Sequence, residues 1–117
     1  MWIKNLTQHS PTVEQFDGHD GVTAVDPKAV GLLNFATPPS VEEINERAAA
    51  LAALASGFGS AMIGGAPYLM GPLCEVLKAV GVQPLFSFTE RKSLEKLNPD
   101  GSVTKTSVFA HVAWVAV

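Results

Sequence analysis

The feature that most constrains this chain is a stretch without a charged residue, from Ala48 to Cys74. A stretch of this length could cross the roughly 30 Å hydrocarbon core of a bilayer. Seven breaks interrupt it, at Gly57, Gly59, Gly64, Gly65, Pro67, Gly71 and Pro72. A membrane-spanning segment needs continuous internal hydrogen bonding, which these breaks remove. We therefore interpret the stretch as a helix, a buried strand, a turn and a second helix, and we expect no membrane partner.

Composition indicates one ordered domain, covering residues 1–117. Apolar residues make up 47% and charged residues 16%, which excludes a disordered chain. The net charge of −3 predicts no binding to duplex nucleic acid. Half of the eight basic residues nevertheless cluster near the C-terminus: Arg91, Lys92, Lys96 and Lys105. An anion site would therefore draw on the C-terminal third.

The cysteine, the histidines and the N-terminal residues limit which chemistry and which cellular compartment the sequence indicates. Cys74 is the one cysteine, so no intramolecular disulfide can form, and its apolar neighbours predict a buried thiol. The scattered histidines give no metal-binding pattern, and no cofactor motif is present. Residues 1–5 lack the apolar run of a signal peptide, so we expect a cytoplasmic protein.

Periodicity and turn chemistry predict alternating strands and helices. We expect strands at 2–7, 32–35, 60–63 and 83–88, and helices at 11–16, 27–31, 41–56 and 67–80. Ser40 and Glu43 form a capping box for the long helix. After a polar loop at 89–92, residues 98–101 (Asn-Pro-Asp-Gly) predict the turn of a hairpin. The pattern predicts an α/β, Rossmann-like fold: a mainly parallel sheet flanked by helices, with a C-terminal antiparallel β-hairpin.

Three loops of this fold would meet at the carboxyl ends of the parallel strands, where ligands bind in such sheets. They are residues 7–10, 63–66 and 89–92. Gly64 and Gly65 would let the backbone approach a phosphate at the N-terminus of the following helix, or would simply form a turn. Tyr68, one turn into that helix, is a candidate for stacking on a base or a core aromatic.

The polar residues of these loops have a functional and a structural interpretation. His9 could transfer a proton near neutral pH, or be a solvated loop residue. Gln8 and Ser10 could position a hydroxyl or phosphate group, or satisfy the backbone. Arg91 and Lys92 could bind phosphate. Lys105 would extend their basic patch or protect an edge strand, and we interpret His111, in an apolar strand, as a core histidine.

The segment "GVQPLFSFTERKSLEKLNPDGSVTKTSVFAHVAWV" resembles small stand-alone CRISPR-associated proteins of type III systems. These are CARF-like (Rossmann-fold) proteins that bind cyclic oligoadenylates, and several are ring nucleases. The likeness lies in "PLFSFT" with its following arginine, in "PDGSV" with "KTSVF", and in the "HV" after it. The opening "LTQHSPTVEQ" fits more loosely.

The resemblance implies a homodimer that binds cyclic tetra-adenylate or hexa-adenylate across its two-fold axis. It implies metal-independent cleavage, in which a ribose 2′-OH attacks the adjacent phosphate and leaves a 2′,3′-cyclic phosphate. On that basis His9 transfers the proton, while Arg91 and Lys92 neutralise phosphate charge. The side chains and backbone that would hold the ring are those of Thr7, Gln8, Gly64, Gly65 and Thr89.

Two alternatives stay open from the sequence. Similar proteins often carry basic residues near the final strand, where this chain has Ala110 and Ala113, so a non-catalytic binder of cyclic nucleotides is one. The other is a dimeric interaction module without a small ligand, packed through the alanine-rich helix.

Overall fold

Three short and two long segments pair into one five-stranded sheet in the computed structural model, which describes residues 1–117. The strands are β1 Trp2–Leu6, β2 Gly21–Val22, β3 Ser60–Ile63, β4 Gln83–Leu97 and β5 Val103–Ala116. Their order is β2-β1-β3-β4-β5, and every neighbouring pair is parallel except β4–β5, which is antiparallel. The fold is therefore mixed α/β, with a mostly parallel sheet and a C-terminal hairpin.

Local signals in the sequence set the helices. They are the 3₁₀ helix η1 Val13–Phe16 and the α-helices α1 Pro27–Leu33, α2 Val41–Leu54 and α3 Pro67–Ala79. The Ser40 hydroxyl accepts a hydrogen bond from the Glu43 backbone N–H at 3.1 Å, so the predicted cap of α2 is confirmed. Asp26 caps α1 in the same way, through the Lys28 N–H at 2.9 Å. Proline opens α1 and α3, where its missing N–H costs nothing.

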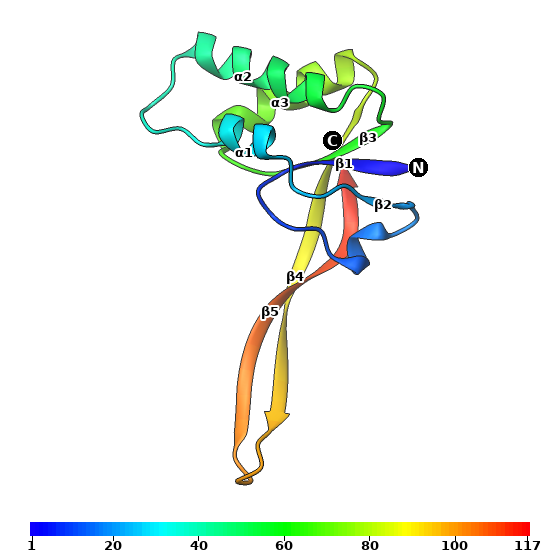
Figure 1. The fold of residues 1–117 in the computed structure, drawn as a ribbon, viewed down its shortest axis with the longest axis vertical. Helices are drawn as coiled ribbons and strands as arrows, with labels where there is room; N and C mark the ends of the chain where they lie inside the picture. The colour runs from blue at the N-terminus through cyan, green and yellow to red at the C-terminus, as the bar shows by residue number, and fades with distance from the viewer.

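The three α-helices cover one face of the sheet, and only η1 covers the other (Figure 1). The larger hydrophobic cluster lies on the helical face and includes Leu6, Leu51, Ile63 and Leu73. On the opposite face a small cluster packs against Phe16 and Trp114: Ile3, Val22, Met62 and Leu85. The uncharged stretch at 48–74 contributes to the larger cluster, and no helix is long and apolar enough to cross a membrane.

Two expected elements are wrong. Residues 32–33 are the end of α1, and 34–35 form no strand. Leu33 is buried by that helix, which explains the short apolar run without a strand. The polar residues 89–92 do not form a loop, because β4 continues through them while pairing with β5. Cys74 is half-buried rather than buried, and burial raises the pKa of its thiol, against the opposing effect of Lys78.

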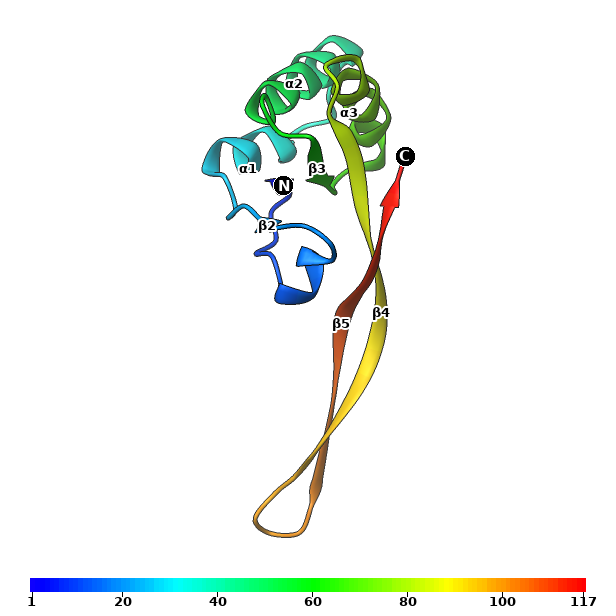
Figure 2. The ribbon, with the colours of Figure 1, turned by 90° about the vertical axis from the view of Figure 1, so that its right-hand side faces the viewer.

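Beyond the helices, β4 and β5 project as a twisted two-stranded ribbon (Figure 2). We call residues 89–111 the arm and the rest of the chain the head. The radius of gyration is 16.8 Å, against about 13 Å for a compact domain of this length. At the base of the arm the register shifts between Phe88 and Thr89, so that Val112 has no partner on β4. This irregularity has the pattern of a β-bulge.

Candidate functional site

The chain segments that follow the neighbouring strands β1 and β3 leave the sheet toward opposite faces. After β1 the chain runs through η1, on one face, to β2; after β3 it runs through α3, on the other face, to β4. Neighbouring strands whose connections diverge leave an open crevice at their carboxyl ends. The segment after β1 and the base of the arm form the walls of this crevice.

A cavity of about 520 Å³ occupies this position, and we call it the polar pocket. Its lining is Thr7, His9, Ser10, Thr12, Gln15, Met62, Ile63, Gly64, Phe86, Ser87, Thr89, Phe109 and His111. Hydroxyl, amide and imidazole groups therefore face one space from the segment after β1 and from β4 and β5. Of the residues expected at a site, Thr7, His9, Ser10, Gly64 and Thr89 lie together here.

Buried Asn5 shapes the turn that presents His9. The Asn5 side-chain oxygen accepts from the Thr7 backbone N–H at 2.9 Å and from the Thr7 hydroxyl at 2.7 Å. Its amide nitrogen donates to the His9 carbonyl at 2.9 Å. The His9 N–H in turn donates to the Thr7 hydroxyl at 3.1 Å. Because Asn5 and Thr7 are both buried, breaking this network would leave unsatisfied polar groups, so the turn is rigid.

The second histidine of the pocket is held from both sides. The side chain of His111 is only 2% exposed. Its Nδ1 lies 2.5 Å from the Ser87 hydroxyl oxygen, and its Nε2 lies 3.4 Å from a carboxylate oxygen of Asp17. A carboxylate only accepts hydrogen bonds, so Nε2 carries a proton, and in the neutral ring Nδ1 accepts from Ser87. The Trp114 ring packs on the imidazole, with 4.6 Å between centroids.

The glycine pair after β3 has two roles. Gly64 lines the polar pocket. Gly65 has a φ of +156°, and a Cβ there would lie 3.4 Å from the side chains of Leu33 and Met70. Gly65 therefore fits the close contact between the end of α1 and the start of α3, and it does not line the polar pocket.

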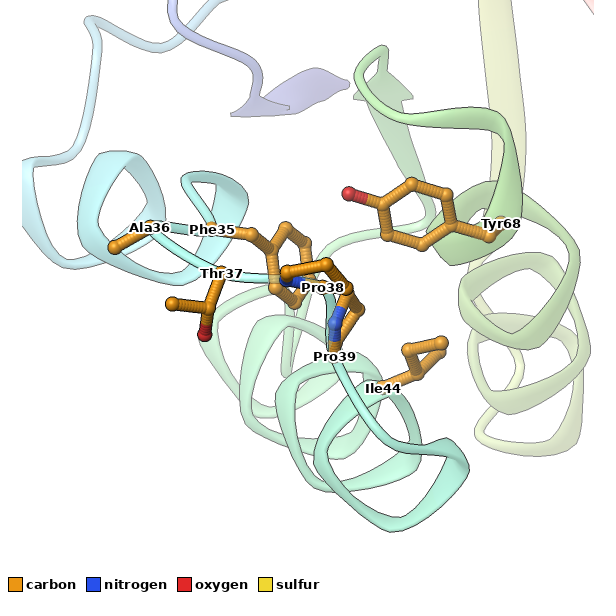
Figure 3. Close-up of a pocket in the computed structure, with 7 residues that line it drawn as sticks. All are labelled: Phe35, Ala36, Thr37, Pro38, Pro39, Ile44 and Tyr68. Atoms are coloured by element: carbon orange, nitrogen blue, oxygen red, sulfur yellow. The ribbon is translucent and has the colours of Figure 1, made fainter.

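Gln8 and Tyr68 lie outside the polar pocket. Gln8 exchanges side-chain hydrogen bonds with Asn34, at 3.0 and 3.4 Å. Tyr68 lines a separate cavity of about 590 Å³ between α2, α3 and the loop after α1 (Figure 3). Its ring meets Phe35 edge to face, with 5.4 Å between centroids. The Arg47 guanidinium lies over the same Phe35 ring, so this aromatic pair is built into the head.

The three expected basic residues all lie on the arm. The Arg91 guanidinium carbon is 5.3 Å from the centre of the Phe109 ring, which lines the polar pocket, so Arg91 stands at the pocket rim. Lys92 forms an exposed ion pair with Glu90 at 3.8 Å, on the other face of the strand. Lys105 pairs with Glu95 at 3.8 Å, further along the arm. The pocket lining itself contains no lysine or arginine.

Comparison with known proteins places the chain in a family. Residues 1–115 match the family described as uncharacterized protein MJ1673. The chain belongs to this family. No curated protein and no solved structure matches it significantly. The family description names no ligand or reaction, so we infer the chemistry of this MJ1673-family chain from the residues that line its polar pocket.

Sequence reasoning missed five residues of this site in the MJ1673-family chain: Asn5, Asp17, Thr12, Gln15 and Ser87. Asn5 carried little signal, because the charged Lys4 precedes it and nothing in the strand marks Asn5 as the buried polar residue. Asp17 and Ser87 carried none, because their contacts with His111 join segments distant in sequence. His111 is buried, as its apolar strand predicts, and it also lines the pocket.

Proposed function

We propose that this protein is a ring nuclease that binds and cleaves a cyclic oligoadenylate, cyclic tetra-adenylate being the first to test. The observation that carries the proposal is that His9 and His111 line one pocket together with five hydroxyl side chains and Gln15. Two histidines facing one space supply a base and an acid for a single proton-coupled step. The strand order and the divergent connections support the Rossmann-like assignment that accompanies this function.

The proposed reaction needs two proton transfers. A ribose 2′-oxygen attacks the neighbouring phosphorus, and its proton goes to His9. The phosphorus–5′-oxygen bond breaks, and the departing oxygen takes a proton from the imidazolium form of His111, passed on through the Ser87 hydroxyl that contacts its Nδ1. One product end is a 2′,3′-cyclic phosphate and the other a 5′-hydroxyl, so every bond and proton of the proposed step is accounted for. Asp17 and Ser87 would fix the imidazole of His111 for this step.

We assign stabilisation of the phosphate charge to basic residues of the arm. Arg91 reaches the pocket rim over Phe109, whereas Lys92 and Lys105 lie outside the pocket lining, each in an ion pair with a glutamate of the same arm. Phosphate binding is favoured by such charges and by the hydroxyls of Thr7, Ser10 and Thr89. One pocket of about 520 Å³ is of the size that suits a drug-sized ligand. A ring of four nucleotides is larger, which favours the homodimer.

Incubation with cyclic tetra- and hexa-adenylate in EDTA, followed by chromatography of the products, tests the proposal. We expect linear products with a 2′,3′-cyclic phosphate end. His9→Ala and His111→Ala should each reduce the rate by about 100-fold or more. His19→Ala is the matched control, because His19 lies outside the pocket. Intact rings after long incubation would rule out metal-independent cleavage of these two substrates.

Binding without cleavage is the second candidate, and the pocket lining without lysine or arginine favours it. In that case cyclic tetra-adenylate should raise the melting temperature while the ring stays intact. If no cyclic nucleotide changed the melting temperature, the remaining candidate would be an interaction module that binds no small ligand.

A further inference from the structure

We infer that two copies of this chain associate through their arms, which pack face to face and antiparallel about a two-fold axis beside Ser93 and Ser107. The inference goes beyond the proposed function, because it concerns the protein without ligand and names the surface that forms the dimer.

The arm is poorly stabilised on its own. A two-stranded ribbon without a covering layer is marginally stable in water. On the arm every side chain from Thr89 to Phe109 except that of Asn98 is exposed, with Leu97 at 74% and Phe109 at 69%. Its outer strand β5 also has an open edge along its whole length. A stable arm of this length therefore calls for a second surface.

The register places the two most exposed apolar side chains of the arm, Leu97 and Phe109, on the same face of the arm. This face continues the face of the sheet that carries the polar pocket. On β4 this face carries Thr89, Arg91, Ser93, Glu95 and Leu97. Directly opposite on β5 are His111, Phe109, Ser107, Lys105 and Val103. We call these ten residues the arm face. Two contacts confirm the assignment: the Arg91 guanidinium lies over Phe109, and Lys105 pairs with Glu95.

The arm face is complementary to itself when turned end for end about its central pair, Ser93 and Ser107. Arg91 then lies over the partner's Glu95, and Phe109 lies over the partner's Lys105. Opposite charges meet, and a cation meets an aromatic ring. The small serines occupy the centre, where two ribbons come closest. A homodimer with two-fold symmetry requires this kind of self-complementary surface.

The length of the arm fits the same axis. Ser93 is the midpoint of residues 89–97, and Ser107 is the midpoint of residues 103–111. The tip of each arm would therefore reach the base of the other.

This arrangement would add groups from the partner to each polar pocket. Phe109 lines the pocket, so the partner's Lys105 would stand at the rim beside Arg91. The partner's Leu97 would lie over Thr89 and close part of the opening. A pocket whose own lining holds no cation would thus receive one from each arm.

Light scattering after gel filtration, in the absence of nucleotide, tests the inference. The wild-type protein should be a dimer at about 100 µM. Arg91→Glu and Glu95→Arg each place like charges opposite one another twice, so each should weaken dimerisation by about tenfold or more. Mixing the two variants restores opposite charges in a heterodimer, and the double variant R91E/E95R restores them in a homodimer.

Glu90→Arg and Lys92→Glu on the other face are the matched controls, since they break a similar ion pair within the chain. They should leave dimerisation unchanged. A monomeric wild type, or singly substituted chains that dimerise like it, would overturn the inference. A dimer that behaves as expected but neither binds nor cleaves cyclic adenylates would overturn only the proposed function.

Discussion

The two halves of β4 both pair antiparallel with β5, but their surroundings are opposite. Pro84 and Leu85 are buried in the head, whereas residues 89–97 are all exposed in the arm. The head is held together by apolar burial. The arm depends on cross-strand contacts such as the ion pair of Lys105 with Glu95, and exposed ion pairs contribute about 0–1 kcal/mol. Hydrogen-bonded pairing thus sets the shape of both regions, while burial stabilises only the head.

The largest expected difference between the regions concerns apolar truncation. Leu51→Ala removes a side chain with no exposure from the larger core, and should lower the free energy of unfolding by about 2–5 kcal/mol. Leu94→Ala in the arm should change it by less than about 0.5 kcal/mol. Urea unfolding followed by circular dichroism measures both. Equal losses would mean that the arm folds as one unit with the head.

A pair of asparagines gives the next largest effect. Asn5→Ala removes the hydrogen-bond partner of the buried Thr7 N–H and of the His9 carbonyl, at a cost of roughly 1–3 kcal/mol. Asn98→Ala removes bonds to Ser102 and Thr104 near the arm tip, where water replaces them, so it should cost less than about 1 kcal/mol. Unfolding gives both values. A loss of nucleotide binding is expected for the Asn5 variant alone.

Two glycines should respond with opposite signs. Gly101 in the arm turn has a φ of +86°, so Gly101→Ala is strained by about 1 kcal/mol. Gly71 lies within α3 with open space around it, so Gly71→Ala should stabilise the head by about 0.5–1 kcal/mol. Hydrogen exchange should show faster exchange in the arm for the first variant, and slower exchange in the head for the second. Faster exchange throughout the head of the Gly101 variant would contradict local opening of the arm.

The smallest effects concern acid. The pKa of Asp26 in the head lies below its ordinary value of 3.8, chiefly through the Lys4 hydrogen bond and then the Lys28 N–H. The pKa of Asp100 in the arm is also lowered, chiefly by the Ser102 hydroxyl. A lowered pKa in the folded state stabilises fully above pH 3.8, and this is lost as the pH falls through the lower value.

Asp26→Asn should therefore flatten the acid side of the stability profile of the head, measured by thermal unfolding between pH 2 and 6. Asp100→Asn should alter only the exchange rates of the arm over the same range. An unchanged head profile for the Asp26 variant would show that its ion pair with Lys4 contributes nothing.

Much of the head could be predicted, because its signals are local. β3 was expected at its observed bounds, and the caps at Ser40 and Asp26 mark where α2 and α1 begin. The predicted loop at 89–92 failed for a general reason. Polarity was interpreted as a loop, but a strand exposed on both faces is polar as well, and only its long-range pairing with β5 distinguishes the two.

The candidate site divides in the same way. Thr7, His9 and Gly64 could be grouped because carboxyl ends of parallel strands meet at one edge. Gln8, Gly65 and Tyr68 follow the same strands but turn toward the helices. The Asp17–His111–Ser87 contacts depend on how the hairpin folds back, which no short segment of sequence encodes.

The unpaired Val112 sets the face of the sheet on which His111 lies. His111 and Trp114 are three residues apart, so in a regular strand they would point to opposite sides of the sheet. The extra residue reverses the alternation between them, and both rings end on the same side, in contact. If Val112 were instead paired regularly and Trp114 kept its place, the imidazole of His111 would point toward the helices. The position of His111 in the lining of the polar pocket thus depends on a single interruption of strand pairing.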